Sequence, residues 1–369
     1  MRIGLPILAL LLGIGPAACR STDDDSMKFP DCEVGGDSDG DADSDSDADA
    51  DGDGDTEGLP PECVCGPLRT VWGTSVDDVW SGGPNGFLTH WDGEGWTDTQ
   101  LDRPETIYGV WGFAPDSIFA VGGLENGCSD SPRASVFRFD GGGWHSDFST
   151  TDGGGPLRAA WGSSVGSLLA VGDGTMLRYD GWTWSGSDSF IGENLTGILG
   201  FSAFDVFVVG WHVSLVIDAE GCAVIFHYGE AGWEEQYHEP GGHLLSAVWV
   251  ASPTAAFAVG RRGMIVGYDG EAWSEMDSGV ANDLNAVWGV AADDVFAVGN
   301  GSAILHYNGV AWTSMHLDMN LDLYGIWGFS ASEIFAVGGA DYGLADPCSA
   351  VVLRYDGAGW NVVHEADLR

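Results

Sequence analysis

Positive charge is scarce in this chain of 369 residues. Lysine and arginine together number 13 against 56 aspartates and glutamates, for a formal net charge of −43. Lys28 is the only lysine. A protein with this charge balance repels the phosphates of nucleic acid and the anionic surface of a membrane. We therefore expect no nucleic-acid partner, and contact with lipid only through a covalent anchor.

A hydrophobic run long enough to span a membrane is also missing. The apolar run from Ile3 to Ile14 is shorter than the roughly 20 residues of a transmembrane helix. Arg2 precedes it and Pro16-Ala17-Ala18-Cys19 follows it, which is typical of a cleaved export signal. We predict a signal peptide over residues 1–18.

The Ala-Ala-Cys at the end of this signal resembles the bacterial lipobox, in which the cysteine is acylated and becomes the mature N-terminus. The resemblance implies a lipid anchor on Cys19 and a location at the bacterial outer membrane or cell surface. A plain signal peptide is the alternative, and it shares the expectation of export.

Apolar residues are absent from the segment that follows. From Asp37 to Asp55 every second residue is aspartate, separated by serine, glycine and alanine. Such a segment has nothing to bury, so we predict a disordered acidic stalk over residues 19–62. It resembles the Asp-rich stalks of surface lipoproteins from myxobacteria and their relatives. An EF-hand calcium loop is the alternative, but Gly58 stands where its bidentate glutamate is needed.

One motif recurs seven times after residue 67, which is the strongest signal in the chain. The clearest copy begins Leu284-Asn285-Ala286-Val287-Trp288-Gly289 and closes at Trp312. The tryptophan of the Trp-Gly pair corresponds to Trp72, Trp111, Trp161, Leu199, Trp249, Trp288 and Trp327. The closing tryptophan recurs at Trp96, Trp144, Trp184, Trp233, Trp273, Trp312 and Trp360.

Each copy holds four short β-rich runs, which we call strands A to D. Asp-Gly or Asn-Gly, which favours tight hairpins, separates strands C and D in most copies. Four antiparallel strands repeated every ~40 residues form one blade of a propeller. We predict an all-β fold, a seven-bladed β-propeller over residues 63–369, with a β-solenoid or paired sandwiches as alternatives. The blades are expected at about 68–100, 107–148, 157–188, 195–238, 244–277, 284–316 and 323–364.

The repeats resemble two known families. Val337-Gly338-Gly339, followed by Tyr355, Asp356 and Trp360, resembles a kelch repeat. His306-Tyr307-Asn308-Gly309, followed by Trp312, resembles the Asp-box of BNR (sialidase-like) repeats. The resemblance covers roughly Leu68 to the C-terminus and implies the fold and the blade type, not an activity.

Two polar positions recur in most copies, and we interpret both as structural. Strand C carries His90, Arg138, Arg178, His227, His306 and Arg354, with Gly267 in the fifth copy. An acidic residue opens strand B at Asp78, Asp205, Asp294 and Glu333. We expect the strand C residues to serve packing rather than metal binding. The acidic residues are expected to accept hydrogen bonds from the turn backbone.

A binding site must break the repeat, because identical blades cannot form an asymmetric pocket. Three insertions separate strands B and C, at residues 124–134, 211–221 and 340–347. In a propeller these loops share one face, and loops on a rigid scaffold commonly carry binding. We predict that this face binds a protein or glycan partner through Arg133, Trp211, His212, Arg261, Arg262, Asp341 and Tyr342. The plainer interpretation is a set of longer loops stapled by disulfides.

Motifs for catalysis are few. A zinc-protease His-Glu-x-x-His and a phosphate-binding loop are absent. We predict a monomeric, non-catalytic binding module without a cofactor or metal. A secreted carbohydrate-active hydrolase or lyase of sialidase-like type is the first alternative, and a structural or assembly spacer is the second. A sialidase-like site resembles three convergent arginines, an acidic residue and a Tyr–Glu pair. Convergent charged residues at the central channel would favour the hydrolase.

The two ends of the repeat region do not share a blade, so no strand from one end completes a blade begun at the other. Leu68 opens strand A of the first blade, and Trp360 to His364 forms strand D of the last. An even number of cysteines in an exported chain favours disulfides. We predict a bridge from Cys63 or Cys65 to Cys348 across this junction, with the other of the pair bonded to Cys128. Cys32 and Cys222 are then left over, bonded to each other or free.

Overall fold

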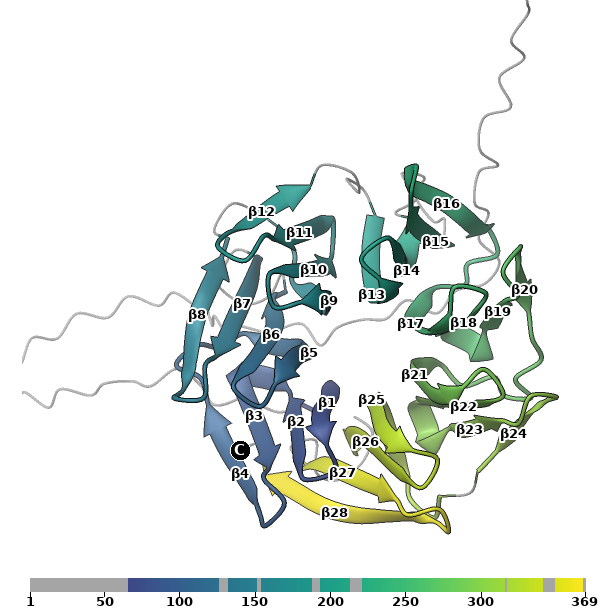
Figure 1. Cartoon of the computed structure of the whole chain (residues 1–369). Helices are drawn as coiled ribbons and strands as arrows, with labels where there is room; N and C mark the ends of the chain where they lie inside the picture. The colour runs from purple at the N-terminus through teal and green to yellow at the C-terminus, as the bar shows by residue number, and fades with distance from the viewer. Residues whose placement is uncertain are drawn as a thin grey trace, which may run out of the picture.

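The computed structural model describes residues 66–125, 132–150, 154–187, 193–212, 221–315, 317–340 and 349–367. Seven four-stranded antiparallel sheets stand around one axis in chain order (Figure 1), and each is formed by one copy of the repeat. The prediction of a seven-bladed propeller is therefore confirmed. No helix within these ranges is long and apolar enough to cross a membrane.

The strands follow the four runs of each repeat. The bounds in the first four blades are β1 (Thr70–Ser75), β2 (Asp78–Gly82), β3 (Phe87–Trp91), β4 (Trp96–Gln100), β5 (Thr106–Ala114), β6 (Ser117–Leu124), β7 (Arg133–Phe139), β8 (Trp144–Ser149), β9 (Leu157–Ser164), β10 (Ser167–Gly172), β11 (Thr175–Tyr179), β12 (Trp184–Ser187), β13 (Glu193–Ser202), β14 (Asp205–His212), β15 (Cys222–Gly229) and β16 (Gly232–Glu239). Those in the last three are β17 (Leu245–Ser252), β18 (Ala255–Gly260), β19 (Ile265–Tyr268), β20 (Trp273–Glu275), β21 (Leu284–Ala291), β22 (Asp294–Gly299), β23 (Ile304–Tyr307), β24 (Trp312–Ser314), β25 (Leu321–Ser330), β26 (Glu333–Ala340), β27 (Ser349–Tyr355) and β28 (Trp360–Asp367). Short 3₁₀ turns, η2 (Pro84–Gly86), η4 (Arg261–Gly263) and η5 (Asn300–Ser302), join strands B and C of blades one, five and six.

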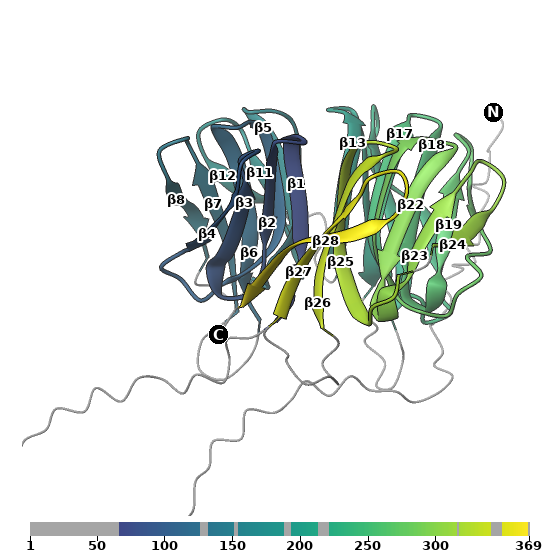
Figure 2. The ribbon, with the colours of Figure 1, turned by 90° about the horizontal axis from the view of Figure 1, so that it is seen from below.

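The first strand of each blade lines the central channel, and the fourth forms the rim (Figure 1). Figure 2 shows the blades upright around the axis, with β1, β13 and β25 running along it. Small residues at one position of the inner strands allow neighbouring inner strands to approach each other closely. A Cβ on Gly197, for example, would lie 3.0 Å from the Cα of Ala247 in the next blade.

The closing tryptophans join neighbouring blades. Each indole packs on the aromatic residue that ends strand C of its own blade, with ring centroids 5.0 to 5.8 Å apart. Several also meet the strand B aromatic of the preceding blade edge-on, as Trp144 meets Trp80 at 5.4 Å. The repeated tryptophan is thus explained by packing between blades, which buries large aromatic area at each junction.

The Trp-Gly pair is a second junction. The indole of Trp249 would lie 2.8 Å from a Cβ on Gly289 of the next blade, so only glycine leaves room for it. The same contact couples Trp72 to Gly112, Trp161 to Gly200 and Trp288 to Gly328. Blade four alone has leucine, Leu199, in place of the tryptophan, and the following blade alone has Val250 in place of the glycine. The two departures from the motif therefore form one contact.

Two tryptophans leave this pattern. In blades two and seven the glycine of the next blade is met by Phe113 and Phe329 instead. The indoles of Trp111 and Trp327 meet each other at 6.1 Å in an edge-on contact. Because blade one separates their blades, these two side chains must meet inside the ring. They narrow the channel at the level of the tryptophans.

The acidic residues that open strand B do not bind the turn backbone as expected. Their carboxylates pair with the strand C side chain opposite: His90 Nε2 lies 2.7 Å from Asp78 Oδ1, and Arg354 Nη2 lies 2.5 Å from Glu333 Oε2. The His90 ring also stacks on Trp80 at 4.0 Å. Strand C thus carries a cationic or imidazole group because that group bridges an aromatic ring and a carboxylate.

The aspartate or asparagine between strands C and D does serve its turn, as predicted. Oδ1 of Asp92 accepts hydrogen bonds from the backbone of Glu94 and Gly95, at 2.9 and 2.8 Å. Five other blades repeat this arrangement, at Asp140, Asp180, Asp269, Asn308 and Asp356. The backbone hydrogen bond from Gly95 helps to hold the pKa of Asp92 below its usual value.

The ring closes without a shared strand, as expected from the phase of the repeat. Leu68 N donates to Gly338 O of blade seven at 3.3 Å, and Trp327 Nε1 donates to Gly73 O at 3.1 Å. Packing of blade-seven residues such as Phe335 against blade-one residues completes the junction. The cysteines of the predicted bridges lie outside the described residues, so their pairing remains a prediction. Cys222, at the start of β15, is fully buried and disulfide-bonded rather than free.

Candidate functional site

A β-bulge at the start of the inner strand turns one side chain of a blade into the channel. In blade two, Ile107 pairs with Gly122 and Gly109 pairs with Val121, so Tyr108 has no partner residue. A Cβ on Gly122 would overlap the carbonyl oxygen of Thr106. The glycine that ends the strand B motif therefore makes room for the bulge, and bulges often re-aim a side chain beside a functional site.

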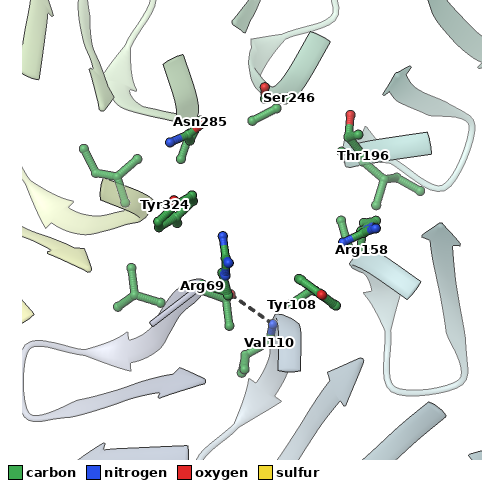
Figure 3. Close-up of a pocket in the computed structure, with 18 of the residues that line it drawn as sticks. Arg69, Tyr108, Val110, Arg158, Thr196, Ser246, Asn285 and Tyr324 are labelled. Atoms are coloured by element: carbon green, nitrogen blue, oxygen red, sulfur yellow. Dashed lines mark hydrogen bonds between the residues drawn. The ribbon is translucent and has the colours of Figure 1, made fainter. Parts of the chain in front are cut away.

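The same bulge occurs in blades two to seven, and Arg69 holds the equivalent place just before β1. Seven side chains therefore converge on one mouth of the channel (Figure 3), and they differ from blade to blade. They are Arg69, Tyr108, Arg158, Thr196, Ser246, Asn285 and Tyr324. We call these residues the mouth ring.

The mouth ring surrounds a small cavity with an apolar wall. Beneath the polar side chains the cavity is lined by Val71, Val110, Ala160, Ile198, Val248 and Ile326. Its volume is about 180 Å³, below the roughly 300–1,000 Å³ typical of pockets for drug-sized ligands. The cavity therefore suits a side chain or a chain end of a larger partner.

Arg158 is fully engaged by its neighbours. Its guanidinium forms two hydrogen bonds to Asp173, at 3.2 and 2.7 Å, and one to Glu125 at 2.8 Å. It also stacks on the Tyr108 ring at 4.4 Å. Burial alone would lower the pKa of Arg158, but the bonds and charge of Asp173 outweigh it and raise the pKa.

Tyr108 and Glu125 form a pair beside Arg158. The Tyr108 hydroxyl donates to Glu125 Oε1 at 2.7 Å. Burial, with the neighbouring carboxylate, raises the pKa of Tyr108 to about 12. Burial would raise the pKa of Glu125 too, but Arg158 and the bond from Tyr108 hold it below its usual value. At neutral pH the site therefore holds a neutral phenol and an ionised carboxylate.

Two of the uncharged side chains in the mouth ring form hydrogen bonds between blades. Thr196 Oγ1 donates to Leu245 O at 2.7 Å, and Asn285 Nδ2 donates to Leu323 O at 2.8 Å. Both bonds tie one blade to the next. Ser246 makes no such side-chain bond among the described residues.

Arg69 differs from Arg158. It stacks on the Tyr324 ring at 4.2 Å, and Figure 3 shows it pointing into the opening. Within the described ranges no carboxylate forms an ion pair with it, whereas Arg158 holds two. The mouth ring thus offers one guanidinium to a ligand.

The predicted binding residues that the structure describes do not line this cavity. Arg133, at the start of β7, lies 3.7 Å from the fully buried Glu105, so it anchors the base of an insertion. Trp211 and His212 end β14, where His212 Nδ1 lies 2.8 Å from Glu193 Oε1. Arg261 and Arg262 form η4, whose backbone is fixed by a bond from Arg262 N to Asp283 Oδ1. Asp341 and Tyr342 lie outside the described residues.

Sequence reasoning missed the mouth ring. A usable signal was present: the second residue of Leu-x-small-Val-Trp is arginine, tyrosine, arginine, threonine, serine, asparagine and tyrosine in successive blades. Every other position of this run keeps its chemical character. The one variable position inside an otherwise constant strand marks the site that breaks the repeat.

The opposite face carries the A–B and C–D turns. Trp182 is 89% exposed on this face, and Phe201 and Phe204 are exposed to lesser degrees.

One segment matches the spacing of a hydrolase motif. Residues Gly162 to Gly166 have the Gly-x-Ser-x-Gly spacing of a hydrolase nucleophile, but they form the end of β9 and the turn to β10, with no helix after them. No three His, Cys, Asp or Glu side chains of the described part are grouped as a metal site requires.

No family model and no curated protein matches this chain. Solved structures with a similar fold include YCF48 bound to D1 peptide, with 16% identity over 79% of this chain and 92% of that one, and a TM-score of 0.59. YCF48 from Cyanidioschyzon merolae has 15% identity over 81% and 98%, with a TM-score of 0.57. The WD40 β-propeller domain of Doa1 has 11% identity over 75% and 91%, with a TM-score of 0.56. At these identities the likeness shows the propeller fold, and the kelch or BNR blade type stays a prediction.

Proposed function

We propose that this protein is a non-catalytic binding module that takes up a segment of a protein partner at the mouth ring. The observation that carries the proposal is the set of seven non-equivalent side chains that one repeated bulge aims into a single cavity. A cavity of about 180 Å³ accepts a side chain or chain end. YCF48, a propeller of similar fold, has been solved bound to D1 peptide.

A sialidase-like hydrolase is the second candidate because the mouth holds a Tyr–Glu pair beside two arginines. Physical chemistry favours the binding role. The raised pKa of Tyr108 opposes its use as a nucleophile, and Asp173 and Glu125 already occupy Arg158. Release of 4-methylumbelliferone from its sialic acid glycoside, lost in Tyr108→Phe, would establish the hydrolase instead.

Blocking the mouth tests the binding role. Ser246→Trp places an indole in the cavity without breaking a described side-chain hydrogen bond, whereas Ser314→Trp places one on the exposed outer strand β24. We expect capture of the partner from an envelope extract to fall at least about tenfold for Ser246→Trp and to stay unchanged for Ser314→Trp, since interface energy concentrates in central pockets. Equal capture by both variants would refute the mouth as the site.

We further propose export and lipid anchoring at the bacterial outer membrane or cell surface, on the pattern that ends at Cys19. A single acyl chain gives only weak membrane binding, so a second signal or chain is needed for stable anchoring. Cys19→Ser should abolish incorporation of labelled palmitate and release the protein from the membrane fraction. Equal labelling of both proteins would contradict the lipid anchor and leave the binding role untouched.

A further inference from the structure

One guanidinium in the mouth ring is held in place but left without an acid. The Tyr324 ring lies 4.2 Å from the centre of the Arg69 guanidinium and covers one of its faces. Stacking of this kind uses the face of the group and leaves its in-plane N–H donors free. Of the two arginines in the mouth ring, only Arg69 lacks a carboxylate ion pair within the described ranges.

Arg158 is the other arginine of the mouth ring, and it serves a structural role. Both groups stack on a tyrosine of the mouth ring, and both line the same cavity. Arg158 is closed off by Asp173 and Glu125, whereas Arg69 points into the opening (Figure 3). The difference places the positive charge available to a ligand on the blade-one side of the mouth.

We propose that Arg69 binds a carboxylate of the protein partner. A carboxylate fits the planar donor edge of an arginine with two parallel hydrogen bonds. A phosphate fits less well, because a dianion would meet one available positive charge and the nearby carboxylates Glu125 and Asp173. The Ser246 hydroxyl lines the same cavity and can serve a polar neighbour of the carboxylate.

This inference rests on the proposed peptide-binding function and adds the chemistry of the ligand. The carboxylate has two possible sources, an aspartate or glutamate side chain or the C-terminus of the partner chain. Both fit a cavity of about 180 Å³. Their chemistry at Arg69 is the same, and only defined peptides separate them.

Three libraries of random hexapeptides test the inference against the full-length protein. The first has a free C-terminus and no internal acid, the second is amidated with one central aspartate or glutamate, and the third is amidated without acid. Peptides retained by the immobilised protein are quantified by mass spectrometry. Arg69→Gln, Arg69→Lys, Ser246→Trp and Arg178→Gln are compared with the unchanged protein. Arg178 is an exposed strand C arginine far from the channel, so its variant matches the loss of charge.

We expect the first or the second library to be enriched at least about tenfold over the third. Arg69→Gln should remove the enrichment, Arg69→Lys should restore part of it, and Arg178→Gln should retain all of it. Enrichment of the first library identifies a chain terminus, and of the second a side chain. Equal retention of all libraries, sensitive to Ser246→Trp but not to Arg69→Gln, overturns the carboxylate and keeps peptide binding. Retention insensitive to both substitutions overturns the proposed function as well.

Discussion

Gly122→Ala should destabilise the propeller by about 3 kcal/mol or more, because the added methyl overlaps a backbone carbonyl that cannot move without losing the bulge. The oxygen is that of Thr106, one residue before the Ile107 that pairs with Gly122. Relief of the overlap requires the inner strand to shift, which displaces Tyr108 from the mouth ring. Chemical denaturation followed by tryptophan fluorescence measures the loss.

Gly186→Ala is the matched control, since no atom lies within 4 Å of a Cβ at this position on β12. Its effect should stay within about 0.5 kcal/mol, as for surface substitutions in general. A Gly122→Ala protein as stable as this control would show that the bulge tolerates a side chain. The explanation of the repeated strand B glycine would then be wrong.

Leu199→Trp should be destabilising by itself and tolerated together with Val250→Gly. The indole added to blade four would take the place that Val250 now fills, at a cost of about 2 kcal/mol for overpacking. Val250→Gly alone removes a buried side chain, at a similar cost. In the double variant the indole can pack on the glycine, as Trp249 packs on Gly289.

A double-mutant cycle measures this coupling. We expect the double variant to be about 1 kcal/mol less stable than the unchanged protein, for a favourable interaction energy of about 3 kcal/mol. The reference pair is Trp249 with Gly289, in which Gly289→Ala should be destabilising. If the two single effects are simply additive, Leu199 and Val250 do not interact, and their occurrence in adjacent blades is a coincidence.

The fold could be predicted from the periodicity of the sequence. Each repeat packs its faces against the next repeat, so the residues on those faces cannot vary freely. Trp312 and its six counterparts recur since each lies between two blades. The turn role of Asp92 was predictable from its dipeptide, because the contact is local in sequence. Contacts between blades are harder to predict. The contact of Leu199 with Val250 is visible in the sequence only because both residues depart from the motif in adjacent copies.

The site was harder to predict because a bulge changes which face of a strand a residue takes. Simple alternation along Leu323-Tyr324-Gly325-Ile326 does not reveal that Tyr324 enters the channel, since the extra residue shifts the register. The insertions drew attention to the connections between strands B and C, and not to the inner strands that carry the mouth ring. The role of Asp78 was misjudged for a related reason: its partner His90 is on another strand, 12 positions away.

Site-specific photocrosslinking in the native cell tests the mouth most directly. A benzophenone amino acid is placed at Ser246 in the mouth ring, and in a second protein at Trp182, which is 89% exposed on the opposite face. We predict a discrete crosslinked partner from position 246 and none from position 182. A partner crosslinked from position 182 and not from position 246 would contradict the assignment of binding to the channel mouth.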